Sequence, residues 1–400
     1  MCNIAIVGGG ASGLCCAILL KRQCKKISVT IYEAKERVGK KLAVTGNGRC
    51  NISNAFLDRH RYHGDAEFAM NIISKFDFSN QKSFFESIGV PFVVEANGKA
   101  YPRSLQAASV VDALRFEAEE LGVNIRLSDT VDSIERIGNK FIIKNKEYDA
   151  VLLATGGIAG SKNLNNYGYD ILRKFGHKIE QPFPSLVQIE TDTDIVRQLQ
   201  GIKIQADIII ETHNRTKRES GELLFCEYGI SGPPVLQISR LVSASHSTIK
   251  IDITPEYTKE ELTEFISQRV IHNPTRKISE LFAGFINKKL SHVIFKKVGI
   301  NINDTCNTIN HSKINELANE LKSFTLKAKR TKGFENAQVT AGGAQTAQFF
   351  DTLMSKKVKG LFIAGELLNV DGDCGGFNLA FAWASAYVAS QGIIDYIENR

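Results

Sequence analysis

The sequence lacks any hydrophobic run long enough to cross a membrane, which takes about 18–20 consecutive apolar residues. Its most apolar runs, such as 151–155 and 361–364, have the length of single strands and lead into glycine. It also lacks a basic N-terminal segment followed by an apolar stretch and a cleavage site, the pattern of a secretory leader. We therefore expect a cytoplasmic protein with no membrane partner.

Paired metal-ligand or dithiol motifs are absent as well. The eight cysteines include no Cys-x-x-Cys pair, which argues against a dithiol redox centre and a zinc ribbon. None of the eight histidines has metal-ligand spacing, so no metal site is expected. Cys50 is a candidate reactive thiol, but with no partner His or Cys nearby in the sequence we favour simple burial.

The N-terminus carries a glycine-rich turn between a strand and a helix. Residues 3–7 form a short apolar run rich in β-branched residues, typical of a strand buried on both faces. The pattern G-x-G-x-x-G follows at Gly8, Gly10 and Gly13. Gly8 permits a tight turn, Gly10 lets the backbone approach a pyrophosphate, and Gly13 lets the helix pack closely on the strand. The turn therefore predicts a dinucleotide site at the positive end of a helix that contains Ser12.

An acidic residue stands where such a site needs one. A second strand, residues 27–32, ends at Glu33, twenty residues beyond Gly13. Its carboxylate would accept hydrogen bonds from ribose hydroxyls and would repel a 2′-phosphate. The glycine pattern occurs once in the chain, so we expect no dedicated NADPH domain. NADH or NADPH, as a reductant, would have to dock transiently.

A loop rich in glycine and asparagine follows Glu33. A loop of this composition over residues 39–54 would not hold one conformation by itself, so we expect contacts with a ligand to order it. The alternative is a mobile surface loop. The candidate cofactor contacts here are Lys41, Thr45, Gly46, Arg49 and Asn51.

The C-terminal part repeats the strand–glycine–helix arrangement. A buried strand over 361–364 enters Gly365, and a glycine pair at 375–376 opens a helix predicted over 377–390. In a flavoprotein, the positive end of such a helix can lie against the N1–C2=O edge of the flavin. An ordinary closing helix with a glycine cap is the alternative. The further candidate contacts are Thr155, Gly156, Gly365, Glu366, Gly375, Gly376, Phe377 and Asn378.

Several motifs together resemble one known family. The most specific are TGNGRCN at Thr45–Asn51 and DGDCGGFN at Asp371–Asn378, and shorter matches lie at 7–13, 39–41, 98–102, 154–157, 221–225, 229–233, 337–343 and 360–366. They resemble a family of bacterial FAD-binding proteins labelled NAD(P)/FAD-dependent oxidoreductase, or aminoacetone-oxidase-like flavoproteins. The resemblance implies FAD as cofactor, with Asp371 near its ribityl chain or phosphates, and it covers nearly the whole chain. Glu227 departs from it, since this family is expected to have His there.

The middle of the chain has a different pattern. Short alternating or apolar runs suit a small antiparallel β-domain, and three helix-like segments follow. We expect an α/β protein whose Rossmann-type FAD-binding domain is split in sequence, with an inserted β-domain and a helical subdomain. The predicted domains are 1–185 with 335–400 (FAD-binding), 186–255 with 324–334 (β-domain) and 256–323 (helical); the predicted middle helices are 259–269, 275–287 and 313–323.

The charge is concentrated in one region. The chain has a formal charge of +7, and residues 287–332 contain ten Lys/Arg against three Asp/Glu. Such a basic stretch fits an anionic substrate, an acidic partner or a nucleic acid, or is simply a solvated helix face.

Three functions remain open. The favoured one is an FAD enzyme that oxidises a small amine or reduces an unsaturated carbonyl compound by hydride transfer at flavin N5, activities that the resemblance implies. The second is an FAD-dependent RNA-modifying enzyme, and the third a non-catalytic flavin-binding redox module. No catalytic acid or base is identified; Tyr101, residues 102–103 and residues 228–232 are candidates to border a substrate pocket.

Overall fold

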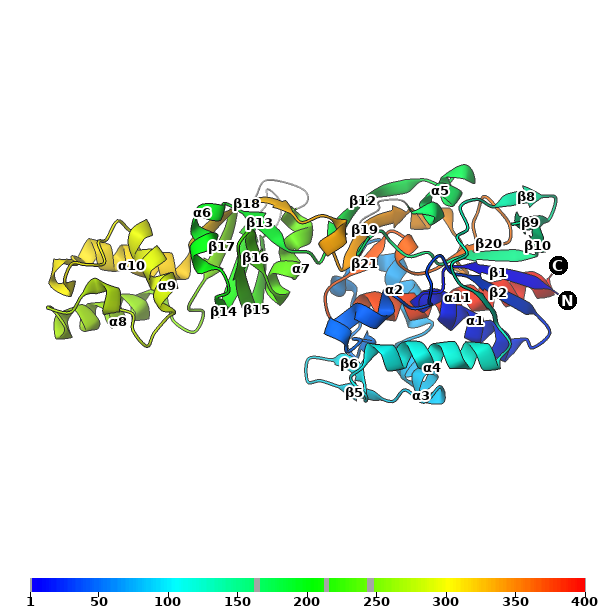
Figure 1. The fold of residues 1–400 in the computed structure, drawn as a ribbon, viewed down its shortest axis with the longest axis horizontal. Helices are drawn as coiled ribbons and strands as arrows, with labels where there is room; N and C mark the ends of the chain where they lie inside the picture. The colour runs from blue at the N-terminus through cyan, green and yellow to red at the C-terminus, as the bar shows by residue number, and fades with distance from the viewer. Residues whose placement is uncertain (1, 162–165, 212–215, 243–247, 400) are drawn as a thin grey trace. The chain divides into compact units, whose positions relative to one another are not determined.

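The chain folds into two compact units. A computed structural model describes residues 2–161, 166–211, 216–242 and 248–399. The first unit comprises residues 1–183 and 339–400, and the second comprises residues 184–338 (Figure 1). The boundaries therefore stand at 183/184 and 338/339, where the sequence prediction stands at 185/186 and 334/335.

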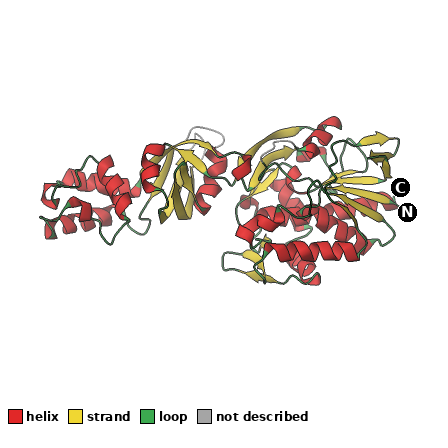
Figure 2. Ribbon diagram, in the orientation of Figure 1, coloured by secondary structure: helices red, strands yellow, loops and turns green. Residues whose placement is uncertain are grey.

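A parallel sheet forms the core of the first unit, in the order β20-β11-β1-β2-β7. Figure 1 labels its strands β20, β1 and β2, and Figure 2 draws strands in yellow. Strands β1, β11 and β20 are buried almost completely, which explains their unbroken apolar sequences. In the pairing of β11 with β20, Val151 lies opposite Leu361, so the sheet is built from both ends of the chain. This confirms the split Rossmann-type fold. The strands are β1 Asn3–Val7, β2 Ser28–Tyr32, β7 Asn124–Arg126, β11 Ala150–Leu153 and β20 Leu361–Ile363.

Two helices from opposite ends of the chain pack together beside this sheet. They are α1 (Ala11–Gln23) and α11 (Phe377–Glu398), and the Ser12 hydroxyl of α1 donates a hydrogen bond to the Ala382 carbonyl of α11. Within the described residues, no helix has both the length and the apolar character needed to span a bilayer. The other helices of this unit are α2 Ala66–Ser74, α3 Phe78–Ser87, α4 Ala107–Glu120 and α5 Tyr167–Lys174.

Small sheets complete the first unit in the orders β3-β6-β5, β10-β9-β8, β12-β19 and β21-β4. The pairing of β21 with β4 joins the segment before α11 to residues early in the chain. The strands are β3 Ser53–Asn54, β4 Tyr62–Gly64, β5 Phe92–Val94, β6 Lys99–Pro102, β8 Glu135–Ile137, β9 Lys140–Ile143, β10 Lys146–Tyr148, β12 Ile179–Ser185, β19 Val339–Ala344 and β21 Val370–Gly372.

The second unit is a closed antiparallel barrel, in the order β13-β16-β15-β14-β17-β18, with helices around and beyond it. One hydrophobic cluster runs from the barrel into the helices. The strands are β13 Ile189–Thr191, β14 Lys203–Glu211, β15 Thr216–Cys226, β16 Gly229–Ser231, β17 Thr248–Asp252 and β18 Phe324–Thr331. The helices are α6 Thr193–Val196, α7 Pro233–Val242, α8 Lys259–His272, α9 Lys288–Lys297 and α10 His311–Lys322.

The predicted helix over 275–287 is wrong. That segment contains only the 3₁₀ turn η4 (Ile278–Glu280), and Gly284 has a φ of +78°, which interrupts any regular helix. The next helix, α9, begins at Lys288, one residue after the predicted segment ends. Asn287 caps it, because its side chain accepts a hydrogen bond from the Lys289 backbone N–H. Asparagine is a strong N-cap, so the apolar pattern before it belongs to a turn.

A buried histidine makes the stability of the first unit pH-dependent. The His177 ring stacks on Phe349 at 4.8 Å between ring centres, and its Nε2 lies 3.0 Å from the Ser355 hydroxyl. Burial, with a smaller effect of the nearby Lys357 charge, lowers the pKa of His177 to about 4. The unfolded chain therefore binds this proton more readily than the native one.

We predict that the free energy of unfolding falls as the pH drops from about 6.5 towards 4, by up to ~3 kcal/mol from this group. Urea unfolding at pH 7.5 and pH 5 measures the effect. The variant His177→Phe should show a shallower pH dependence. Equal pH dependence in both proteins would contradict the assignment.

Candidate functional site

The three glycines of the G-x-G-x-x-G pattern are glycine for two different reasons. Gly8 has a φ of +111°, and a Cβ there would lie 2.3 Å from the Ala154 carbonyl oxygen. A Cβ on Gly13 would lie 1.9 Å from the carbonyl oxygen of Gly8. A Cβ on Gly10 would meet nothing described within 4 Å. The protein's own packing therefore requires Gly8 and Gly13, whereas the space at Gly10 is open for a ligand.

The Glu33 carboxylate stands beside this turn. One of its oxygens accepts a hydrogen bond from the Gly9 N–H and the other from the Lys35 N–H, both at 2.8 Å. These bonds fix the side chain next to the glycine turn. Each carboxylate oxygen can accept more than one hydrogen bond, so capacity for ribose hydroxyls remains.

The glycine–asparagine loop is ordered mainly by its own backbone. It contains the 3₁₀ segment η1 (Leu42–Gly48), in which the Thr45 hydroxyl donates to the Leu42 carbonyl. Gly46 has a φ of +58°, and a Cβ there would lie 2.8 Å from the backbone nitrogen of Asn51. The Arg49 guanidinium lies 4.7 Å from the centre of the Tyr101 ring. Thr45 and Gly46 thus shape the loop, and Arg49 is directed towards β6.

Asn51 connects this loop to the C-terminal helix. The Asn51 side-chain amide is oriented so that both its nitrogen and its oxygen form hydrogen bonds. The nitrogen donates to the carbonyls of Ser53 and Ala100, and the oxygen accepts from the Gly376 N–H at 3.1 Å. Gly376 has a φ of +96°, and a Cβ there would lie 2.3 Å from the Ser53 carbonyl oxygen. The Trp383 indole N–H donates to the Ile52 carbonyl at 2.9 Å. The two remote candidate segments are therefore in direct contact.

A second link joins the two segments through charge. The Lys41 ammonium lies 2.6 Å from one Glu366 carboxylate oxygen, and the other accepts a hydrogen bond from the Thr340 N–H at 2.7 Å. A Cβ on Gly365 would lie 2.4 Å from the Ser12 hydroxyl oxygen. The Ser12 hydroxyl donates to the Ala382 carbonyl and so contributes to the packing of α1 on α11; a phosphate contact of Ser12 stays a prediction.

Hydrogen bonds between side chains and the backbone hold three further candidates, Thr155, Gly156 and Asn378. The Thr155 hydroxyl contacts the Asn166 side-chain oxygen at 3.3 Å, and the Asn166 amide donates to the Gly156 carbonyl at 2.8 Å. Asn378 pairs in both directions with the backbone of Gly372, at 2.8 and 2.7 Å. Its amide therefore holds the turn before α11 instead of facing an open space.

The other members of the C-terminal group precede or begin α11. Asp371 lies in β21 and is 1% exposed. Gly375 has a φ of +135°, which favours glycine, and Phe377 packs edge-on against Tyr62 with ring centres 5.9 Å apart. The two candidate pocket borders lie in different units, residues 102–103 in the first and 228–232 in the second.

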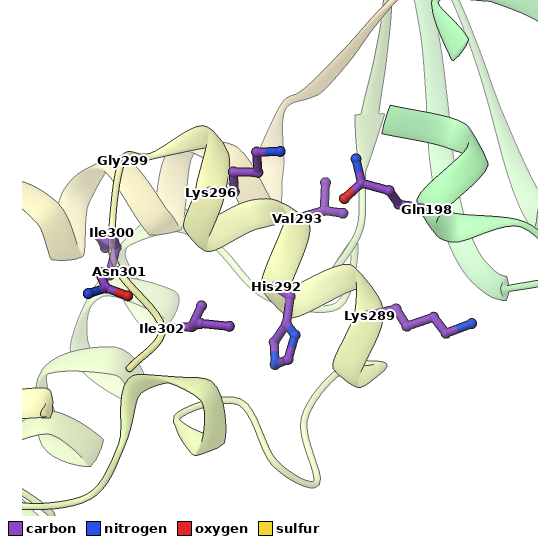
Figure 3. Close-up of a pocket in the computed structure, with 9 residues that line it drawn as sticks. All are labelled: Gln198, Lys289, His292, Val293, Lys296, Gly299, Ile300, Asn301 and Ile302. Carbon is purple, nitrogen blue, oxygen red and sulfur yellow. The ribbon is translucent and has the colours of Figure 1, made fainter. Parts of the chain in front are cut away.

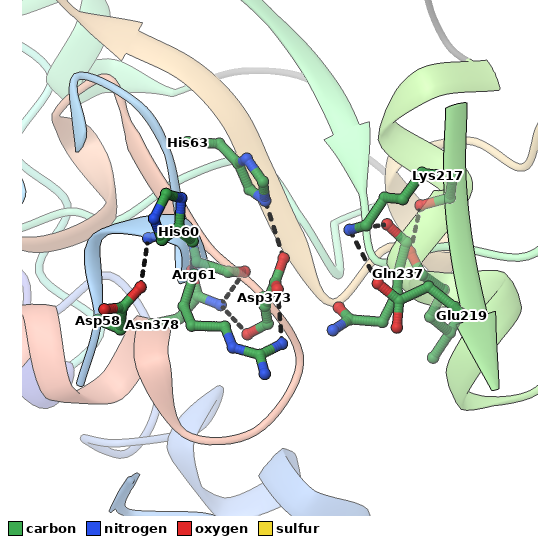
Figure 4. A network of polar contacts seen from close by, with 12 residues as sticks. Asp58, His60, Arg61, His63, Lys217, Glu219, Gln237, Asp373 and Asn378 are labelled. Atoms are coloured by element: carbon green, nitrogen blue, oxygen red, sulfur yellow. Dashed lines mark hydrogen bonds and ion pairs between the residues drawn. The ribbon is translucent and has the colours of Figure 1, made fainter. Parts of the chain in front are cut away.

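Sequence reasoning missed a charged cluster next to the start of α11 (Figure 4). The His63 Nε2 lies 2.8 Å from one oxygen of Asp373, and the Arg61 guanidinium lies 3.4 Å from the other. The Asp373 side chain is only 5% exposed. The pairing of β4 with β21 brings these residues together across some 310 positions, so spacing along the chain gives no signal for the cluster.

Cys50 is fully buried, and burial raises the pKa of its thiol to about 12. A thiol with that pKa is almost entirely protonated at neutral pH, so it is a poor nucleophile. The structure therefore favours the packing role for Cys50.

The arrangement fits a dinucleotide cofactor such as FAD. Both α1 and α11 begin at glycines with no side-chain cap and no acidic residue in the first turn. By contrast, Asp65, Asp77 and Asn166 cap α2, α3 and α5, and α4, which also lacks a side-chain cap and a first-turn acid, begins at Gln106 and not at a glycine. The free N–H groups at the start of α1, next to the open space at Gly10, suit the phosphates of a dinucleotide. Those at the start of α11 suit the electron-rich edge of the flavin ring.

Comparisons with known proteins identify the family and several relatives of this chain. A family model described as "HI0933-like protein Rossmann domain" matches residues 2–392. The chain is 35% identical to a 3-dehydro-bile acid delta(4,6)-reductase of Clostridium scindens, covering 98% of both chains. It is 29% and 25% identical to ribosomal RNA dihydrouridine synthases of Haemophilus influenzae and Escherichia coli, covering 97% of both chains in each case.

The open space at Gly10 allows a clean test. In Gly10→Ala the new methyl group meets no described atom and the backbone φ of −84° suits alanine, so thermal stability without cofactor should not fall. FAD affinity, measured by flavin fluorescence, should drop at least about tenfold because the methyl group occupies the space meant for the pyrophosphate.

Gly333→Ala is the matched control, since a Cβ there also meets nothing within 4 Å. It should bind FAD as the unmodified protein does. Unchanged FAD affinity in Gly10→Ala would contradict the placement of the cofactor.

Proposed function

We propose that this chain, which belongs to the HI0933-like Rossmann family and is an FAD-dependent oxidoreductase, reduces a carbon–carbon double bond conjugated to a carbonyl group in a small organic substrate. The observation that carries the proposal is the 35% identity, over 98% of both chains, to a relative named as a delta(4,6)-reductase. The name of that relative places double bonds at positions 4 and 6 beside an oxidised position 3.

Reduction is a better proposal than amine oxidation because it unites the relatives. Dihydrouridine is uridine whose ring double bond, next to a carbonyl, has been reduced, so all three names denote reduction of the same kind of bond. When bound, FAD supplies hydride transfer at its N5 atom. The substrate then gains a hydride at the carbon remote from the carbonyl and a proton at the neighbouring carbon. NADH or NADPH is the proposed source of the electrons.

Tyr101 is our proposed source of the substrate proton. It lies on β6 beside the glycine–asparagine loop, and its side chain is largely buried, with the residue 5% exposed. Among the described residues its hydroxyl has no hydrogen-bond partner, while the Arg49 guanidinium lies against its ring. Burial raises the pKa of Tyr101, with a further contribution from Glu95, so the hydroxyl keeps its proton at neutral pH.

A second candidate function is reduction of uridine in RNA. It is supported by the two relatives named as ribosomal RNA dihydrouridine synthases and by the basic stretch over 287–332. It shares the bond chemistry of the first proposal and differs in the size of the substrate. We do not propose the non-catalytic redox module, because the chain is an oxidoreductase.

Anaerobic stopped-flow absorbance separates the two half-reactions. We predict that NADH or NADPH bleaches the flavin and that an α,β-unsaturated ketone, such as a 4-en-3-one steroid, restores its colour with one product formed per flavin. A panel of primary amines should not bleach the flavin. Bleaching by amines without any reoxidation by enones would contradict the proposal.

The variant Tyr101→Phe tests the proton source. Flavin reduction by the nicotinamide should be unchanged, while reoxidation by the enone should slow by about 10²–10⁴-fold, the usual contribution of a positioned acid. Tyr167→Phe, which changes an exposed tyrosine, is the control. Equal reoxidation rates in both variants would rule out this role for Tyr101.

A further inference from the structure

The second unit contains a groove that the cofactor site does not use. It lies between the 3₁₀ turn η3 (Arg197–Leu199) and α9, and its volume is about 690 Å³ (Figure 3). Lys289, His292 and Lys296 contribute to its wall from one face of α9, since positions three and seven apart lie on the same side of a helix. The volume is within the usual range for small-molecule sites.

The groove carries positive charge that no acidic side chain in its lining neutralises. Its lining contains no acidic residue, and among the described residues neither Lys289 nor Lys296 has a carboxylate partner. Lys297 on the same helix, by contrast, pairs with Glu320. Lys289 also lies in the first turn of α9, where there is no acidic residue and the helix dipole disfavours a positive charge. Helix stability therefore does not explain this placement, whereas an anionic ligand does.

The rest of the groove has features that suit more than a simple anion. Val293, Ile300 and Ile302 provide apolar surface against which a flat ring can lie. The amides of Gln198 and Asn301 provide both hydrogen-bond donors and acceptors, as the edge of a nucleobase requires.

His292 adds an unexplained polar atom at this place. Its Nε2 is buried and has no hydrogen-bond partner among the described residues. A buried polar atom without a partner calls for an explanation, which a bound ligand can supply. Because the ring belongs to the groove lining, it also serves as a spectroscopic reporter of occupancy.

We propose that this groove binds a phosphorylated nucleotide, with the phosphate at Lys289 and Lys296 and the base on the apolar surface. The groove lies wholly within the second unit, so the proposal does not depend on the proposed reductase activity. The nucleotide has two potential sources, a free mononucleotide or a residue of single-stranded RNA, and both present the same chemistry to these side chains.

Binding to the FAD-loaded full chain tests the proposal, because the cofactor site is then filled. The probes are uridine 5′-monophosphate, a single-stranded oligouridine and inorganic phosphate, measured by calorimetry and by NMR of the His292 ring. At least one of the two nucleotide probes should bind tighter than phosphate and shift the His292 signals. If the mononucleotide binds, a free nucleotide is sufficient to occupy the groove. If only the oligomer binds, the nucleotide that occupies the groove belongs to RNA.

The double variant Lys289→Ala/Lys296→Ala should weaken this binding at least tenfold. For the oligomer, the slope of log affinity against log salt should decrease by about 0.7, since the two lysines hold one phosphate and each phosphate contact contributes ~0.7 for single strands. Lys288→Ala is the matched control, because Lys288 is in the same helical turn but outside the groove lining. Unchanged FAD content and melting temperature confirm that the variants fold.

Two outcomes would overturn the proposal. One is nucleotide binding that the double variant retains in full. The other is nucleotide affinity no greater than that of inorganic phosphate, which would show that the apolar surface and the amides contribute nothing.

Discussion

The packing of the glycine–asparagine loop on the start of α11 is the constraint on which the site depends. Hydrogen bonds join residues 51–54 to residues 375–383, through Asn51 to Gly376, Asn54 to Gly375 and Trp383 to Ile52. These contacts are buried and close, so they leave no space for a side chain at Gly376. They hold an early loop and a late helix in one fixed arrangement, although more than 300 residues separate them in sequence.

This contact accounts for the organisation of the chain. The parallel sheet takes its outer strand β20 from the C-terminal part, and α11 packs on α1, so both ends of the chain are needed to complete one cofactor domain. The barrel unit is inserted between them and closes on its own strands and core. An insertion of this kind can vary in its surface, including the groove beside α9, without disturbing the cofactor turn.

The sequence predicts those parts of the site that depend on residues close together in the chain. The strand over residues 3–7, the glycine turn after it and the acid at Glu33 follow from spacing, and the structure explains Gly8 and Gly13 by steric contact and Gly10 by open space. The predicted roles of Ser12 and Asn378 as cofactor contacts remain untested, but both side chains are engaged elsewhere. The His63–Asp373 pair and the cap at Asn287 depend on strand pairing and on turn geometry, which apolar periodicity does not encode.

Hydrogen–deuterium exchange of the full chain, with FAD bound and after its removal, tests the central claim most directly. If one cofactor is held jointly by the early turn, the loop and the late helix, removal of FAD should speed amide exchange together in residues 8–13, 45–54 and 375–380. Faster exchange confined to residues 8–13, with the other two segments unaffected, would contradict the account.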